Sequence, residues 1–453
     1  MVGSYGHFGD ERLASTAEEL ITRAASGRTL VLRALAGGRA GEVRYQRFLS
    51  SPQVTTDELL ANVGAHTAQA CAGARVLAIQ DTTEVSFGRA RVGSSELGAG
   101  TDAQSPALFL HPVLAVDRDR QAVVGPLYGE IWTRGDRDVA RRRGQRAYAD
   151  KESRRWLTAM QASAERLQQA RQVIMVADRE ADIYTPFAAR PAGLDLVVRA
   201  RHNRPLADGG KLFQAPEAWA ALGREWVSVA PRGPGDKGRW AHVELRAGAV
   251  EVARPHTAAP GTPETVRLTL VRVVEPAPPE GKQGLCWHLL TTLPVGSLTD
   301  AVEVAGIYRQ RWRIEQLFRS MKSDGLGLED SQLVRAEHLI KLTAIALVAA
   351  SRTMQLVDAR DGSERPASDL LDPDLHPAAA AIGRRLEGRT ARQQNPHPYG
   401  SLAWLSWIVA RLGGWNCYYK PPGPKTMRRG WDKLAERLDG YLQALDELAQ
   451  QNA

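Results

Sequence analysis

The chain has 453 residues, which is long enough to bury two or more hydrophobic cores. Hydrophobic residues make up 43% of the sequence and charged residues 24%, and these proportions exclude a disordered scaffold. The formal charge of +8 and the pI near 9.5 favour a polyanionic partner, either nucleic acid or an acidic membrane surface.

The cysteines and the apolar segments restrict where the protein works. Cys71, Cys286 and Cys417 are far apart and match neither a disulfide framework nor a CxxC zinc pattern, so we expect a reducing compartment and no structural zinc. The N-terminus has no signal-peptide pattern, and the longest apolar stretch, 342–350, is too short to span a bilayer. A soluble cytoplasmic protein with no membrane partner is expected.

The N-terminal domain is predicted to be helical and to cover residues 1–70. Helical patterns occupy 17–23, 44–49 and 55–60, and Thr56 is a candidate N-cap for the third helix. The domain carries a basic face.

Strand patterns begin after residue 70, and we assign residues 71–202 to the first part of a catalytic core. The apolar runs are typical of strands, and the first three fit an antiparallel meander. A helical pattern at 151–170 precedes the fourth run, which predicts a mixed α/β sheet. The predicted strands are 76–79, 110–116, 123–131, 173–177 and 194–199.

An inserted β subdomain is predicted at 203–297, where Gly/Pro-rich turns separate alternating strands. Residues 298–360 are expected to complete the core with a helix that carries Glu315. A helical C-terminal domain, 361–453, follows and is interrupted by a basic Pro/Gly-rich loop at 421–430.

Arginine is concentrated in one segment. An anion-binding role and a solvated arginine-rich loop are both compatible with this cluster. Its members are Arg134, Arg137, Arg141, Arg142, Arg143 and Arg146.

The helix that carries Glu315 has a polar face and an apolar face. The sequence Ser297-Leu-Thr-Asp300 predicts its start through a capping box. Offsets of three, four and seven residues place four polar side chains on one face: Tyr308, Arg311, Glu315 and Lys322. The adjacent apolar face is expected in a core: Ile307, Ile314, Leu317 and Met321. A solvated helix with i,i+4 ion pairs is the alternative interpretation.

Two aspartates stand where apolar strands end. Asp81 follows the first strand and Asp178 follows the fourth, and Glu315 lies on a helix expected to pack on the same sheet. Three carboxylates at a sheet edge can hold two Mg²⁺ ions, or Mn²⁺, for phosphoryl transfer. An aspartate at a strand end also serves ordinary turns or caps. Glu84 and Asp182 rank second as ligands, because Asp182 more plausibly caps or pairs with an arginine.

These motifs together resemble the DDE transposases of the insertion-sequence-four family. The resemblance rests on Asp81-Thr-Thr-Glu, on the segment 178–184 and on the spacing of the polar helix face. Segments 44–49 and 401–414 extend it nearly from end to end. It implies an RNase H-like core in which Asp81, Asp178 and Glu315 are the catalytic metal ligands.

The implied reaction is cut-and-paste transposition. Enzymes of this family nick at a transposon end, form and open a hairpin on that end, and join the 3′ ends to target DNA. The implied partners are double-stranded transposon end DNA, target DNA and a second subunit in a paired-end complex, in a bacterial cytoplasm and associated with the nucleoid. We expect the homodimer contact in the helical C-terminal domain.

The resemblance also implies residues that bind DNA. Tyr308, Arg311 and Lys322 would bind phosphates beside the carboxylates. Trp287 aligns with a family position on which a flipped base stacks. The full set is Tyr308, Arg311, Lys322, Trp287, Arg199, Arg201, Arg319 and Trp312.

Two departures from the family pattern affect DNA recognition rather than the carboxylates. A second N-terminal arginine is replaced by Leu13, and a pair of tryptophans is replaced around 105–108. Two other functions stay open. One is an RNase H-like metal-dependent nuclease without strand transfer, and the other is a catalytically silent inhibitor that binds transposon ends.

Overall fold

The computed structural model describes residues 8–26, 29–88, 96–102, 104–134, 152–229, 238–322 and 325–451. Of the arginine cluster at 134–146, only Arg134 belongs to these ranges, and the other members lie outside the described residues.

The N-terminal segment is helical, as predicted. Its helices are α1 (Glu11–Ser26), α2 (Leu32–Leu35), α3 (Arg39–Ser50) and α4 (Thr56–Ala70). The predicted N-cap of α4 was one residue too late. Thr55 has extended backbone angles, and its hydroxyl accepts a hydrogen bond from the Glu58 N–H, so Thr55 is the cap.

Within the described ranges, one mixed sheet of ten strands forms the centre of the protein. Its first strands are β1 (Arg75–Gln80), β2 (Thr83–Ser86), β3 (Ala107–Asp117), β4 (Ala122–Trp132), β5 (Gln172–Ala177) and β6 (Leu194–Arg199). β1 pairs antiparallel with β3, and β3 with β4, which confirms the predicted meander. β5 pairs in parallel with both β1 and β6. The four-residue strand β2 was not predicted.

The segment 203–297 continues this sheet rather than forming a separate one. Its strands are β7 (Gly223–Val229), β8 (Arg239–Ala253), β9 (Thr265–Val274) and β10 (Cys286–Thr291). β10 pairs antiparallel with β6, and β9, β8 and β7 follow in that order. Hydrogen bonds therefore cross the boundary that the sequence suggested between core and insert.

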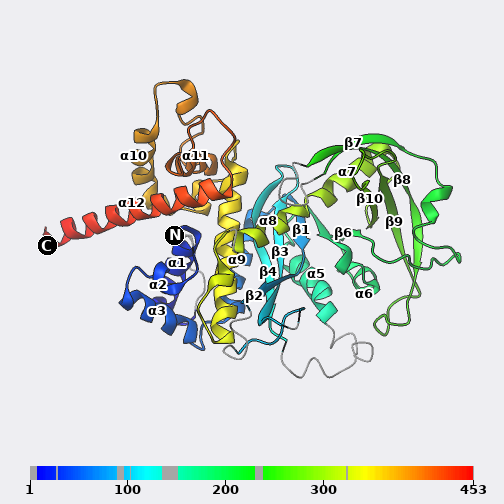
Figure 1. The fold of residues 1–453 in the computed structure, drawn as a ribbon, viewed down its shortest axis with the longest axis horizontal. Coiled ribbons are helices and arrows are strands. Elements are labelled where there is room, and N and C mark those ends of the chain that lie inside the picture. The colour runs from blue at the N-terminus through cyan, green and yellow to red at the C-terminus, as the bar shows by residue number, and fades with distance from the viewer. Residues whose placement is uncertain are drawn as a thin grey trace.

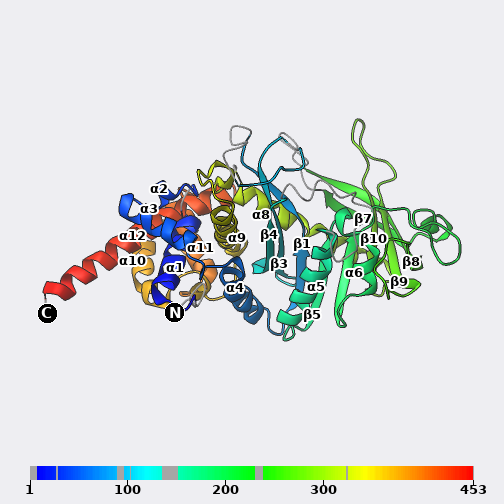
Figure 2. The same ribbon diagram turned by 90° about the horizontal axis from the view of Figure 1, so that it is seen from below.

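Helices cover both faces of the sheet (Figure 2). Alternate residues of β1 belong to two different cores, with Leu77 and Ile79 in one and Val76 and Ala78 in the other. The first core includes α7 (Leu298–Arg309) and α8 (Trp312–Met321), and the second includes α5 (Arg155–Arg166) and α6 (Tyr184–Ala188).

Helix α9 (Ala336–Ala359) lies between the sheet and the terminal helices (Figure 1). It is long and apolar enough to cross a membrane, but 89% of its most apolar stretch is buried inside the protein. It is therefore a core helix, and β4, α1 and α11 are among the elements that pack on it. The apolar stretch 342–350, which the sequence suggested was too short to span a bilayer, forms the middle of this longer helix.

The C-terminal part is helical, with α10 (His376–Leu386), α11 (Leu402–Leu412) and α12 (Pro424–Gln451). The predicted loop 421–430 was too long, because α12 already starts at Pro424. A proline is accepted in the first turn of a helix.

Candidate active site

Asp81 and Asp178 lie side by side at one edge of the sheet. Strands β1 and β5 are parallel neighbours, with Ile79 opposite Val176. Two residues further along each strand come Asp81 and Asp178, so the register sets the two aspartates opposite each other. The sequence prediction that both strands deliver an aspartate to one edge therefore agrees with the pairing.

Asp81 is buried, at 8% exposure, and its side chain is anchored locally. Its Oδ1 accepts a hydrogen bond of 2.8 Å from the Thr82 N–H. Burial and the negative charge of Asp178 raise the pKa of Asp81 to about 7, and Arg311 and the Thr82 N–H oppose that rise. The Oδ1 of Asp178 caps a short 3₁₀ turn by accepting from the Glu180 N–H at 2.7 Å.

Glu315 lies on α8, one turn after a break in the helix. The capping box at Ser297 and Asp300 is present, as predicted. The single helix expected through Lys322 is wrong, however, because α7 ends at Arg309 and α8 starts at Trp312. The apolar face is buried as expected, at Ile307, Ile314, Leu317 and Met321.

Arg311 occupies the break and connects two of the predicted carboxylates. Its Nη1 lies 3.3 Å from Asp81 Oδ2, and its Nη2 contacts Glu315 Oε1. The Arg311 side chain is only 16% exposed, so both ion pairs are shielded from solvent. Arg311 immediately precedes α8, and its pair with Glu315 has the i,i+4 spacing of a helix.

The carboxylates are not gathered around a common point in this arrangement. Within the described ranges, no group of three or more His, Cys, Asp or Glu side chains is close enough to hold a metal ion. The guanidinium of Arg311 supplies positive charge between Asp81 and Glu315 instead.

The two competing carboxylates have other partners. Glu84 accepts hydrogen bonds from the backbone N–H and the hydroxyl of Thr101. Asp182 has a fully buried side chain that pairs with Arg204 and accepts from the N–H groups of residues 201 and 202. The prediction that Asp182 caps or pairs with an arginine is confirmed by its ion pair with Arg204.

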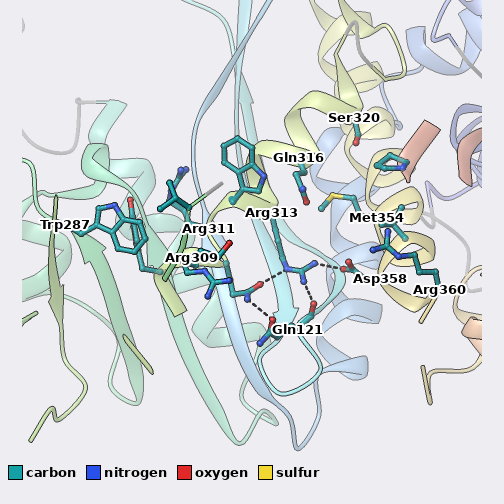
Figure 3. A pocket seen from close by; sticks show the side chains of 17 residues that line it. Gln121, Trp287, Arg309, Arg311, Arg313, Gln316, Ser320, Met354, Asp358 and Arg360 are labelled. Atoms are coloured by element: carbon teal, nitrogen blue, oxygen red, sulfur yellow. Dashed lines mark hydrogen bonds and ion pairs between the residues drawn. The ribbon is translucent and has the colours of Figure 1, made fainter. Parts of the chain in front are cut away.

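A cavity of about 550 Å³ opens beside Arg311 (Figure 3). Trp287 of β10 and Tyr308 of α7 line one end, and their rings meet edge to face with centroids 5.1 Å apart. Tyr308 is only 5% exposed, so it is largely a core residue, whereas Trp287 is half-buried. Trp312, at the start of α8, lines the same cavity.

A hydrogen-bond network holds the helix break in place (Figure 3). Arg313 donates to Asp358 of α9 at 2.7 Å, to Gln310 at 2.7 Å and to the carbonyl oxygen of Gln121. Gln310 also donates to the side chain of Gln121 at 3.1 Å. The β3–β4 turn and α9 thereby fix the segment from which Arg311 projects.

The remaining predicted DNA-binding residues differ in their neighbours and their exposure. Burial lowers the pKa of Lys322, and its charged neighbours are Glu329 and Glu84. Arg199 donates to the Cys286 carbonyl oxygen at 3.1 Å. The exposed side chains are Arg201 and Arg319, the latter 5.9 Å from the Trp312 ring centroid.

Part of the chain is similar to a known protein family. Residues 131–350, a little under half of the chain, match the family model described as Transposase DDE domain. The match supports a DDE transposase. The mixed sheet with flanking helices is consistent with an RNase H-like core of such an enzyme. Asp178 and Glu315 lie inside the matched range, and Asp81 precedes it.

Some residues of the site gave no usable signal in the sequence. Thr82 is part of the Asp81-Thr-Thr-Glu motif, but the sequence pattern does not indicate a function for it. Arg155 lies in the predicted helix 151–170, and its position there does not distinguish it from other arginines. Arg155 donates to the Thr82 hydroxyl at 2.9 Å, across 73 residues of sequence. Asp358 likewise binds Arg313 across 45 residues. Only the tertiary structure brings these pairs together.

Proposed function

We propose that this protein is a cut-and-paste DNA transposase. It would bind a transposon end, nick it, form and open an end hairpin, and join the 3′ ends to target DNA. The observation that carries this proposal is the in-register pair Asp81 and Asp178, linked to Glu315 through Arg311, in a chain that matches the Transposase DDE domain.

The donor set fits hard divalent cations. Carboxylate oxygens are the preferred ligands of Mg²⁺, and a cation beside Asp81 and Asp178 would offset the repulsion that helps to raise the pKa of Asp81. Asp81, Asp178 and Glu315 would hold two Mg²⁺ ions, with Mn²⁺ able to substitute. When bound, the ions would supply activation of a water or 3′-hydroxyl and stabilisation of the leaving oxygen.

Arg311 would exchange partners when DNA binds. A guanidinium that pairs with carboxylates in the free protein can pair equally well with a phosphate, because both offer two oxygens in a plane. A phosphate at the mouth of the cavity would draw Arg311 away from Asp81 and Glu315. Lys322, Arg199, Arg201 and Arg319 would bind phosphates around the site.

Trp287 would stack on a base that leaves the DNA double helix as the hairpin forms. Its ring borders the cavity and is backed by Tyr308, so one edge is supported and the ring remains partly accessible. Stacking on an indole offsets part of the cost of unstacking a base.

The far end of α12 would join two subunits in the paired-end complex. It extends away from the rest of the chain (Figure 1) and carries exposed apolar residues at helical spacing. These are Tyr441, Leu442, Leu445 and Leu448, with exposures of 42–55%. A second copy could bury them in a helix–helix contact.

Light scattering tests this contact. A variant with Leu445→Asp and Leu448→Asp should bind one end but fail to form the complex of two chains and two ends. Glu447→Gln on the same helix is the control. A normal paired-end complex in the double variant would contradict the placement of the contact.

The activity itself is tested with purified protein, a labelled transposon end and Mg²⁺. Hairpin and joined products would support a transposase. Nicks alone would favour the metal-dependent nuclease, and binding without cleavage would favour the silent inhibitor.

A further inference from the structure

Arg155 lies between the two loops that carry Asp81 and Asp178. It is the first residue of α5, and its side chain is only 12% exposed. The guanidinium carbon lies 5.5 Å from the ring centroids of both Trp132 and Trp156. These aromatic contacts and the burial fix the position of the positive charge.

On the Asp81 side, Arg155 acts through Thr82. Its Nε donates to Thr82 Oγ1 at 2.9 Å, and the Thr82 N–H donates to Asp81 Oδ1 at 2.8 Å. Thr82 therefore accepts a hydrogen bond from Arg155 with its hydroxyl and donates one to Asp81 with its backbone N–H.

The Thr82 hydroxyl has a second partner in the buried residue His111. The ring Nδ1 lies 2.9 Å from Thr82 Oγ1, and Nε2 lies 3.1 Å from the amide oxygen of Gln80. Burial and the charge of Arg155 lower the pKa of His111 well below its ordinary value, so the ring is neutral. With the Gln80 amide oxygen facing Nε2, the neutral ring donates from Nε2 and accepts from the Thr82 hydroxyl at Nδ1, and the Thr82 oxygen accepts from Arg155.

These hydrogen bonds fix the two residues that flank Asp81 in the sequence. Gln80 precedes it and Thr82 follows it, and both are tied to His111. A loop held at its two flanking residues has little freedom to turn its carboxylate away.

On the other side, Arg155 reaches the loop of Asp178. Its Nη2 lies 3.7 Å from Glu180 Oε2, and the Glu180 N–H donates to Asp178 Oδ1 at 2.7 Å. Its Nη1 donates to the carbonyl oxygen of Glu152 at 2.9 Å. One guanidinium thus touches both aspartate loops.

A tether of this kind has a physical purpose at such a site. Asp81 and Asp178 repel each other when both are ionised, so the loops that carry them would separate without a restraint. We propose that Arg155 is a positioning residue that fixes the Asp81 loop against the Asp178 loop, and that it acts through the Thr82 hydroxyl. This inference rests on the proposed metal-dependent function of the same carboxylates.

The test uses Thr82→Val, which removes the hydroxyl but keeps the shape, together with Arg155→Gln. Thr82→Ser restores the hydroxyl. Arg154→Gln is the matched control, because Arg154 is the preceding residue, is 55% exposed and pairs with Glu130 at 3.5 Å. All variants are made in the full chain, and their folding is checked by circular dichroism.

Two measurements are made on each variant. One is Mn²⁺ affinity by isothermal titration in the presence of end DNA, and the other is the Mg²⁺ dependence of nicking at saturating DNA. We expect Thr82→Val and Arg155→Gln to weaken Mn²⁺ binding and to slow nicking by about 10-fold or more, with unchanged affinity for DNA. Thr82→Ser should recover most of both values, and a double variant should be no worse than Arg155→Gln alone.

The outcomes separate the possible roles. Normal Mn²⁺ affinity and nicking in Thr82→Val would overturn the proposal. Weaker DNA binding in Arg155→Gln, with Thr82→Val unaffected, would make Arg155 a DNA contact and would also overturn it. A protein that never nicks, but whose Mn²⁺ affinity still depends on Thr82 and Arg155, would refute the transposase function while supporting this inference.

Discussion

The guanidinium of Arg311 lies 3.3 Å from Asp81 Oδ2, although 230 residues separate the two in sequence. Asp81 is buried and faces the charge of Asp178, and both effects disfavour its ionised form. Arg311 works in the opposite direction, because an arginine stays protonated at every accessible pH. Arg311 therefore favours the ionised form of Asp81 in this arrangement.

The raised pKa of Asp81 predicts that its ionisation destabilises the metal-free protein. Below about pH 4 the aspartate is protonated in both states. Between about pH 4 and pH 7 the unfolded chain loses the proton and the folded protein retains it, so stability falls until the folded group also ionises. Asp81→Asn should therefore raise the free energy of unfolding at pH 8, with little effect at pH 4.

Urea denaturation in EDTA at several pH values measures this difference. Glu251→Gln, at an exposed carboxylate on β8, should give no such pH-dependent gain. A difference between Asp81→Asn and the natural protein that is the same at pH 4 and pH 8 would contradict the raised pKa.

Glu315→Gln should preserve end binding and abolish cleavage. The glutamine keeps the size of the side chain and its place on α8, but it cannot supply an anionic ligand to a divalent cation. Mobility-shift assays should show normal affinity for a labelled end, and the same samples should show no nick in Mg²⁺. Cleavage by this variant at more than a small fraction of the natural rate would remove Glu315 from the catalytic set.

Trp287→Ala should impair hairpin formation more than the first nick. The first nick needs no base outside the helix, whereas the tight turn of a hairpin does. Base–aromatic stacking contributes about 1–3 kcal/mol, so the hairpin step should slow by roughly 5- to 150-fold. Trp287→Phe keeps an aromatic face against Tyr308 and should retain most of the rate. Equal loss of both steps in Trp287→Ala would argue against stacking.

Strand ends were the most predictable part of the site. Short apolar runs that end in an aspartate pointed to Asp81 and Asp178 as candidates, because a buried parallel strand needs apolar residues on both faces. β1 and β5 are parallel neighbours, and the connection between them contains β2, β3, β4 and α5. Local pattern and tertiary arrangement agree at these positions.

The helix break was not predictable from local pattern. Periodicity treated 298–322 as one helix, since neither Gln310 nor Arg311 is a strong helix breaker. The break is fixed by contacts from far away in sequence, above all the hydrogen bonds of Gln310 and Arg313 to Gln121. The proposed role of Arg155 could not be predicted for the same reason, because its contact with Thr82 spans 73 residues of sequence.

The network at the break gives a last prediction. Asp358 accepts from Arg313 at 2.7 Å and from the Val123 N–H at 2.8 Å, and both charged side chains are 17% exposed. Asp358→Asn keeps the shape but leaves a half-buried guanidinium without its counter-charge, so the free energy of unfolding should fall by about 1–3 kcal/mol.

The neighbouring pair Arg360–Asp361 supplies the control for Asp358→Asn. Its N–O distance is 3.1 Å, but Asp361 is 75% exposed, and solvent-exposed ion pairs contribute about 0–1 kcal/mol. Asp361→Asn should leave both urea denaturation and nicking unchanged. Asp358→Asn should also slow nicking, because a looser break lets Glu315 move away from Asp81. Equal stability of the two variants would mean that the network does not hold the break.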